Sequence, residues 1–162
     1  MPEKHVDIYT DGACSGNPGD GGWAAILFYR NFKREISGGE RDTTNNRMEL
    51  KAVIKGLKML KEPCDVTVYS DSRYCVDAFL QGWVYGWQRN GWRTASKEDV
   101  KNVDLWKELL SAMKPHKVTF VKVKGHADNE HNNRCDELAR AAIKALPPVI
   151  PKAEGEGASG EV

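Results

Sequence analysis

The sequence predicts an α/β fold in which a mixed β-sheet is flanked by helices. Three strand-like runs follow one another near the N-terminus, and beyond residue 43 strands alternate with amphipathic helices. In addition, two similar runs, "IYTDGA" at 8–13 and "VYSDSR" at 68–73, each lead a strand into an aspartate. If these strands pair in parallel, both aspartates lie at the carboxyl edge of the sheet, where open α/β sheets bind ligands.

The individual elements follow from apolar periodicity and turn residues. Strands are predicted at 6–11, 23–30 and 32–39 as an antiparallel meander, with the Gly-rich stretch 16–22 as a loop. A helix is predicted at 43–60, capped by Thr44 or Asn45, on the helical spacing of its apolar residues. The remaining predictions are strands at 65–71 and 117–125, helices at 72–80, 103–114 and 132–146, and an irregular or partly helical segment at 83–102.

Length and composition indicate one domain. We place it at 1–146, followed by a Pro-, Gly- and Glu-rich tail at 147–162 that is expected to be disordered. The net charge of +1 does not by itself require a nucleic-acid partner. The sequence has no apolar run of the ~20 residues that cross a bilayer and no apolar signal segment, so a cytoplasmic location without a membrane partner is expected. The four cysteines are scattered and are expected to be free thiols.

Four carboxylates stand where the fold would bury them. Asp11 and Asp71 end strands, although each alone is also an ordinary turn residue. Glu49 and Asp136 align with the apolar stripes of their helices, although the helix dipole, and for Glu49 a capping-box bond to Asn46, would also account for acids in a first turn. Four converging carboxylates would repel one another unless a cation joined them. Oxygen ligands favour Mg²⁺, with Mn²⁺ as an alternative, over Zn²⁺.

A rival metal site would use His126, His131 and Cys135. Their spacing is only partly that of a zinc site, and no second Cys/His pair completes it.

Five blocks of the sequence resemble one known family. They are "YTDGACSGNPGDGGWAAIL", "TTNNRMELKAVIKGL", "VYSDSRYCVDAF", "GWRTASKEDVKNVDLWKELL" and "VKGHADNEHNNRCDELARAAI". Together they are similar to bacterial ribonuclease H of type 1, from about Val6 to Ala145. The resemblance implies a five-stranded mixed sheet, a catalytic domain at 1–146, and endonucleolytic hydrolysis of the RNA strand of RNA–DNA hybrids. It also implies a metal-ligand quartet of Asp11, Glu49, Asp71 and Asp136, with His126 as a further catalytic residue.

The same resemblance suggests a two-metal mechanism. Two Mg²⁺ ions roughly 4 Å apart would activate a water and stabilise the leaving 3′ oxygen, giving 5′-phosphate and 3′-hydroxyl ends. Asp11 is expected to bridge the ions and Asp71 to be the other inner ligand. Glu49 is expected to hold one ion, Asp136 the other, and His126 to transfer protons or help products leave.

Substrate contacts are also implied. Tryptophans alternate with basic residues over 83–101, a pattern typical of nucleic-acid backbones but also of a small self-packed subdomain. The resemblance assigns Asn17, Asn45 and Asn46 to the RNA minor groove, Thr44 and Asn102 to a phosphate pocket, and Trp83 and Lys101 to the DNA strand. This chain departs from relatives at Arg73, where some carry a minor-groove Gln. It also has Phe28 in place of an Arg, so the pocket needs Arg30 or Lys33 as a substitute.

Two alternative functions stay open. One is another nuclease or strand-transfer enzyme of the same superfamily, such as a resolvase or integrase-like protein. The other is a non-catalytic hybrid-binding protein, against which the intact acidic quartet argues. A monomer is expected, and the sequence gives no means of identifying a protein partner such as a single-strand-binding protein.

Overall fold

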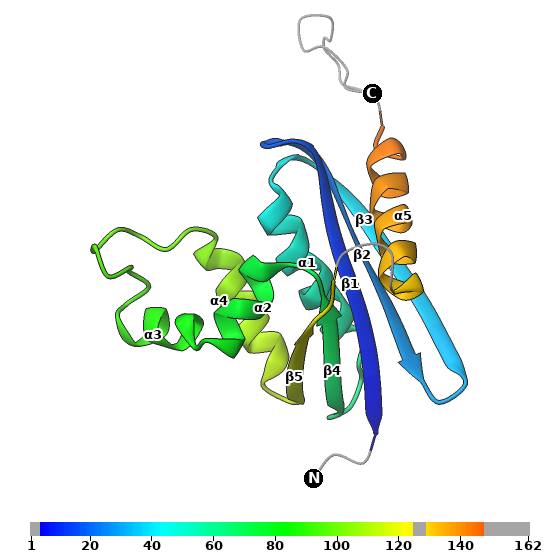
Figure 1. The fold of residues 1–162 in the computed structure, drawn as a ribbon, viewed down its shortest axis with the longest axis horizontal. Helices are drawn as coiled ribbons and strands as arrows, with labels where there is room; N and C mark the ends of the chain where they lie inside the picture. Colours follow the sequence, from blue (N-terminus) through cyan, green and yellow to red (C-terminus); the bar gives the residue numbers. More distant parts are fainter. Residues whose placement is uncertain (1–3, 125–128, 148–162) are drawn as a thin grey trace, which may run out of the picture.

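The computed structural model describes residues 4–124 and 129–147 and contains one five-stranded mixed sheet (Figure 1). Its strand order is β3-β2-β1-β4-β5. The strands are β1 (His5–Gly16), β2 (Gly19–Tyr29), β3 (Phe32–Thr43), β4 (Asp65–Ser70) and β5 (Lys117–Lys122). The helices are α1 (Asn45–Lys58), α2 (Arg73–Leu80), α3 (Trp83–Arg89), α4 (Val103–Met113) and α5 (Glu130–Lys144).

The pairing of the strands confirms the predicted mixed sheet. β1, β2 and β3 form an antiparallel meander, because short hairpins join them. β4 pairs in parallel with β1, and β5 in parallel with β4, because helical crossovers separate these strands in the chain. The carboxyl end of β4, one residue beyond the Tyr9–Tyr69 pair, therefore lies beside the middle of β1, which continues to Gly16.

The prediction of a loop at 16–22 was wrong. β1 continues to Gly16 and β2 begins at Gly19, so that only Asn17 and Pro18, joined by a cis peptide bond, lie between them. The later glycines serve close packing instead of a turn. A Cβ at Gly22 would lie 2.0 Å from the carbonyl oxygen of Ala139 in α5, which shows how closely that helix approaches β2.

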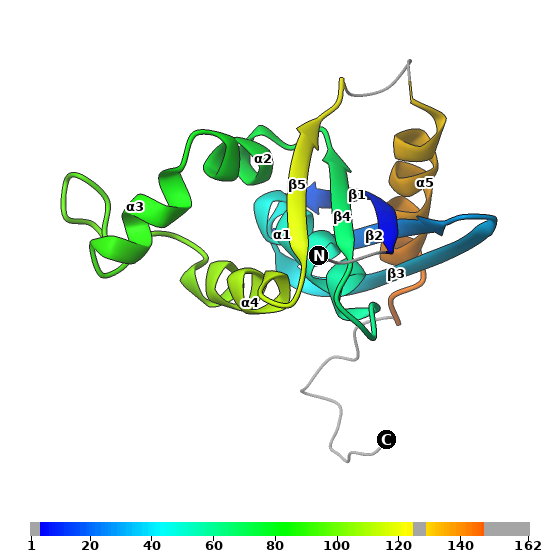
Figure 2. The same ribbon diagram turned by 90° about the horizontal axis from the view of Figure 1, so that it is seen from below.

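Helices cover both faces of the sheet (Figure 2). α1, α2 and α4 pack with the sheet around a large core that includes Ile8, Val68, Ile54 and the fully buried Trp106. α5 covers part of the other face over a smaller core of Ala24, Ile26, Cys135 and Ala139. In both views α3 projects away from the sheet. Each of the four cysteines is a free thiol, as predicted, and three of them are buried.

The observed starts of α1 and α5 show that the prediction of Glu49 and Asp136 as first-turn residues was wrong. Thr44 caps α1 by accepting a hydrogen bond from Arg47 N–H, and Asn129 caps α5. Glu49 and Asp136 consequently lie in the second turn of their helices, beyond the first-turn positions expected. Neither a capping box nor the orphan N–H groups of the first turn therefore account for these carboxylates.

The described residues contain no helix long and apolar enough to cross a membrane. From residue 148 on, the predicted tail lies outside the described residues.

Candidate active site

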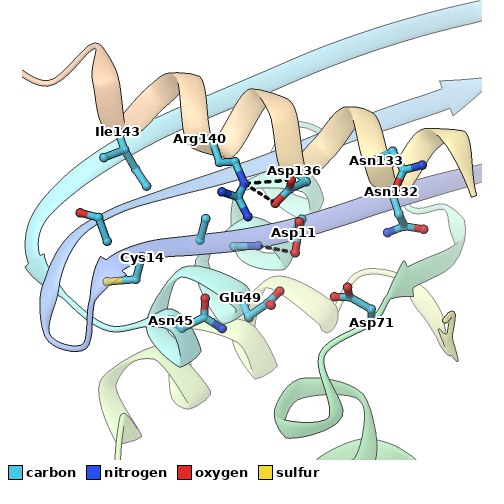
Figure 3. A pocket seen from close by; sticks show the side chains of 13 residues that line it. Asp11, Cys14, Asn45, Glu49, Asp71, Asn132, Asn133, Asp136, Arg140 and Ile143 are labelled. Carbon is cyan, nitrogen blue, oxygen red and sulfur yellow. Dashed lines mark hydrogen bonds and ion pairs between the residues drawn. The ribbon is translucent and has the colours of Figure 1, made fainter. Parts of the chain in front are cut away.

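A cavity of about 340 Å³ opens at the carboxyl edge of β1, between α1 and α5 (Figure 3). Its lining is mostly polar and comprises Asp11, Gly12, Ala13, Cys14, Ser15, Asn45, Glu49, Asp71, Asn132, Asn133, Asp136, Arg140 and Ile143. All four predicted carboxylates are among these residues. The fold thus gathers acids that are up to 125 positions apart in the chain, counting from Asp11 to Asp136.

Strand register places the first two acids. Tyr9 pairs with Tyr69 across the parallel strands β1 and β4. Asp11 follows two residues later on β1, and Asp71 follows two residues later, directly after β4 ends at Ser70. The two similar sequence runs therefore bring their carboxylates side by side, as predicted. Only Asp71 follows the end of a strand, however: Asp11 lies within β1, paired with Ala24 of β2, so the prediction that it ends a strand was wrong.

A glycine lets α1 bring the third acid to this edge. A Cβ at Gly12 would lie 2.5 Å from the backbone nitrogen of Glu49, so only glycine allows the helix to come this close to β1. Glu49 is buried beside Asp11, and its Oε1 has no hydrogen-bond partner among the described residues. A buried carboxylate oxygen without a donor is costly unless another positive group approaches it.

Asp11, Glu49 and Asp71 each offer a carboxylate oxygen, and these three atoms lie within 4.8 Å of one another. Burial, together with the charges of Asp71 and Asp136, raises the pKa of Asp11 to about 8. Burial and the charges of Asp11 and Asp71 raise the pKa of Glu49 well above its usual range. Such a cluster keeps its charge at neutral pH only if a cation neutralises it, and its all-oxygen donor set suits a hard divalent cation.

Asp136 lies in the same cavity but outside this group of three. Its side chain points from α5 toward Asp11 (Figure 3), and both of its oxygens accept from Arg140 Nε, at 2.9 and 3.1 Å. The described residues thus place three of the four predicted ligands in one group and the fourth beside Asp11, bound to a guanidinium.

Of the three residues of the rival zinc site, the structure describes two, His131 and Cys135. His126 lies outside the described residues. His131 packs between the rings of Tyr9 and Phe28, with centroids at 4.8 and 4.6 Å. Cys135 is buried and its thiol donates to the Tyr9 carbonyl at 3.3 Å. The packing of His131 and Cys135 therefore does not favour the zinc site that the sequence left open.

The predicted minor-groove residues surround the mouth of the cavity. Asn45 lines it, and its backbone N–H donates to Asn17 Oδ1 at 3.3 Å, which ties the β1–β2 hairpin to the start of α1. Asn46 is exposed in the first turn of α1. Arg73, in the first turn of α2 beyond Asp71, has a side chain that is 84% exposed and weakly paired with Asp77.

The predicted phosphate pocket is brought together around Arg47. Arg47 N–H donates to Thr44 Oγ1, and Arg47 Nη1 donates to Asn102 Oδ1 at 3.2 Å. Lys101 is exposed next to Asn102. Neither Arg30 nor Lys33 can complete this pocket, because both lie at the opposite end of β3 from Thr44, roughly 35 Å away at 3.3 Å per strand residue.

The three tryptophans of residues 83–92 fall into two groups, one exposed and two packed against the domain, and the sequence allowed for both roles. Trp87 packs edge-on against Trp106, with ring centroids 5.5 Å apart, and Trp92 packs against the same core. Trp83, at the start of α3, is 45% exposed. One tryptophan is therefore available to a ligand, and two hold the segment to the domain.

Sequence reasoning missed several polar residues of this region, among them Ser15 and Asn133 of the cavity lining. Arg140 and Asn132 line the cavity, and Arg47 links α1 to α4 through paired bonds to Asp104. The spacing of Arg140, four residues after Asp136 on one helix, was the available signal for that residue. Asn132 and Arg47 act through contacts distant in the chain, for which the sequence carries no local signal.

Comparisons with known proteins show which family this chain resembles over most of its length. The RNase H family model matches residues 3–144. The Ribonuclease H of Acetivibrio thermocellus is 64% identical over 141 residues, which is 87% of this chain and 96% of that protein. The Ribonuclease H of Chlorobaculum parvum is 62% identical over 142 residues, 88% of this chain and 97% of that protein.

Solved structures show the same likeness. LC9-RNase H1, described as a type 1 RNase H with the type 2 active-site motif, superposes with a TM-score of 0.79 at 31% identity. That match covers 89% of this chain and 74% of the other. LC11-RNase H1, solved in complex with RNA/DNA hybrid, gives a TM-score of 0.63 at 25% identity, over 86% of this chain and 96% of that one. The likeness thus extends over nearly all of the described residues.

Proposed function

The chain belongs to the RNase H family, and from this we propose that it is an endoribonuclease that hydrolyses the RNA strand of RNA–DNA hybrids. The observation that carries the proposal is the convergence of Asp11, Glu49 and Asp71, with oxygens within 4.8 Å, in a chain so similar to proteins named Ribonuclease H. A protein that only bound hybrids would gain nothing from massed carboxylates facing phosphates.

The position of each acid in the cavity indicates which metal ion it would bind. Asp11 stands between Asp136 on one side and Glu49 and Asp71 on the other, so we assign it the bridging position between two ions (Figure 3). Glu49 would hold one ion through its unpartnered Oε1 and Asp136 the other. Asp71 would be the second inner ligand. His126, outside the described residues, keeps the proton-transfer or product-release role that the family resemblance implies.

We assign Mg²⁺ to the site, with Mn²⁺ as the alternative. A pair of such ions, held by Asp11, Glu49, Asp71 and Asp136, would supply an activated water and charge stabilisation for the leaving 3′ oxygen, and we expect 5′-phosphate and 3′-hydroxyl ends. The protein's own contribution is rigidity: β1 and the end of β4 hold Asp11 and Asp71, and Gly12 allows α1 to hold Glu49.

For the hybrid we propose a path across the cavity mouth toward α3. Asn17, Asn45, Asn46 and Arg73 would meet the minor groove beside the acids, where the 2′-hydroxyl distinguishes RNA from DNA. Thr44 and Asn102, with Arg47 between them, would contact a phosphate, and the exposed Trp83 and Lys101 the DNA strand. We further propose that residues 1–146 form the catalytic domain and that it acts as a cytoplasmic monomer.

One gel assay tests the proposal. Labelled RNA–DNA hybrid, duplex DNA and duplex RNA are each incubated with Mg²⁺ and with EDTA. We expect cleavage of the hybrid's RNA strand only, and only when Mg²⁺ is present. The new 5′ ends should carry a phosphate, so a kinase should label them only after a phosphatase has removed it. Asp71→Asn is the matched control, since it should bind hybrid without cutting it. Cleavage of duplex DNA, or of hybrid in EDTA, would refute this assignment.

A further inference from the structure

One positive side chain stands in the wall of an otherwise acidic cavity. Among the described residues that line it, Asp11, Glu49, Asp71 and Asp136 are acidic and Arg140 alone is basic. Arg140 projects from α5 one turn beyond Asp136 (Figure 3). Neither composition nor the family resemblance singled out this residue.

The contact between Arg140 and Asp136 engages both oxygens through which Asp136 would hold a metal ion. Arg140 Nε lies 2.9 Å from Asp136 Oδ2 and 3.1 Å from Oδ1, so that both carboxylate oxygens accept from one donor. Asp136 is also the one predicted ligand that lies outside the group of three acids within 4.8 Å. The carboxylate therefore interacts with the guanidinium on one side and with Asp11, whose pKa it helps to raise, on the other.

A second arginine on the same helix shows what an ordinary surface pair looks like. Arg134 contacts Glu35 at 3.0 Å and Glu137 at 3.1 Å, and it does not line the cavity. Arg134 and Arg140 carry the same charge and lie on the same helix, α5. They differ in that only Arg140 is paired with a carboxylate of the acid cavity.

We propose that Arg140 is a positioning residue that acts through Asp136, as a resident counter-cation that competes with a divalent cation for this carboxylate. The inference rests on the metal site of the proposed function and deepens it. Without metal, the guanidinium limits repulsion among the acids. When a divalent cation binds Asp136, each carboxylate oxygen still has a second lone pair. The guanidinium and the ion nevertheless repel one another at this distance, so the two cations compete for the same carboxylate charge. Arg140 thus weakens cation binding on the α5 side of the site.

Calorimetric titration of the full chain with Mn²⁺, in the absence of nucleic acid, tests this competition. We expect Arg140→Gln to bind Mn²⁺ about two- to fivefold more tightly than the original protein, the range set by an exposed ion pair. Arg140→Lys should fall between the two, because it keeps the charge and loses the planar Nε contact. Arg134→Gln removes the same charge elsewhere on α5 and should leave Mn²⁺ affinity unchanged.

A double-mutant cycle locates the effect. In an Asp136→Asn background, Arg140→Gln should no longer tighten Mn²⁺ binding, because the carboxylate charge for which the two cations compete is gone. Unchanged or weaker binding in Arg140→Gln would overturn the proposal, and so would an equal gain in Arg134→Gln, which would point to net charge alone. The titration needs no hybrid, so its outcome is separate from the cleavage assay: a protein that cuts no hybrid can still show the competition, and an active nuclease can lack it.

Discussion

The rings of Tyr9 and Tyr69 stack with centroids 4.5 Å apart and planes 10° from parallel, on neighbouring residues of β1 and β4. Side chains two residues apart on a strand share a face, so Asp11 emerges on the same face just beyond Tyr9. Asp71 follows Tyr69 at the same interval, directly after β4. An aromatic pair at the register position before the acids thus helps to set how far apart the two carboxylates lie.

Asp11→Asn should abolish cleavage and stabilise the metal-free protein. Asn keeps the shape of the side chain and removes its repulsion with Asp71 and Asp136, which with burial raises the pKa of Asp11 to about 8. Thermal melts in EDTA should show a higher melting temperature for the variant at neutral pH. A variant that melts earlier than the original protein would mean that the Asp11 carboxylate stabilises the metal-free fold.

The pH dependence of that gain follows from the direction of the shift. A folded-state pKa raised to about 8 means that the folded protein binds this proton more tightly than the unfolded chain. Its contribution to the free energy of unfolding is complete below the unfolded pKa of about 4 and is lost as the pH rises through about 8. In urea melts with EDTA, the advantage of Asp11→Asn should therefore be larger at about pH 8 than at about pH 5. An equal advantage at both values would contradict the shift.

Gly12→Ala should destabilise the protein and displace Glu49. The new Cβ would lie 2.5 Å from Glu49 N and 2.7 Å from the Met48 carbonyl carbon, both backbone atoms that cannot rotate away. We expect a loss of about 1–3 kcal/mol in the free energy of unfolding, together with weaker Mn²⁺ binding. Gly86→Ala, in α3 with its nearest neighbour 4.0 Å away, is the control and should gain up to about 1 kcal/mol. Similar melts for both variants would show that α1 can move.

Substitutions of two tryptophans in α3 should affect different properties, hybrid binding in one case and stability in the other. Trp83→Ala should weaken hybrid binding about tenfold, with a stability change within about 0.5 kcal/mol, because the side chain is 45% exposed. Trp87→Ala should instead cost about 2 kcal/mol or more of stability, because it removes the packing against Trp106. Anisotropy titration with EDTA present measures the first and urea melts the second. Unchanged hybrid affinity in Trp83→Ala would remove α3 from the proposed path.

Tyr74→Phe should cost about 1–3 kcal/mol of stability, although only one oxygen is lost. That hydroxyl accepts from Asn102 Nδ2 at 3.0 Å and from Trp106 Nε1 at 3.1 Å, and Trp106 is fully buried. The variant would leave the buried indole N–H without an acceptor. Tyr85→Phe, at a side chain that is 42% exposed, should stay within about 0.5 kcal/mol in the same urea melts. Equal melts for the two variants would show that water replaces the Tyr74 hydroxyl.

Local patterns predicted the elements well where the apolar spacing was regular. The stripe from Leu50 to Leu57 gave α1, and "DVTVYS" gave β4 with the same start. The prediction failed at 16–22, where glycines looked like turn residues. Gly21 and Gly22 are there because α1 and α5 press against β2, a contact between segments more than a hundred residues apart for Gly22 and Ala139.

Sequence alone was enough to find the fold class and the four acids, because hydrophobic periods and short motifs are properties of neighbouring residues. It could not say that Asp11, Glu49 and Asp71 share one group while Asp136 is held by Arg140. That partition depends on how closely α1 and α5 approach the edge of β1. The approach is set by long-range packing at positions such as Gly12, and no local pattern in the chain records it.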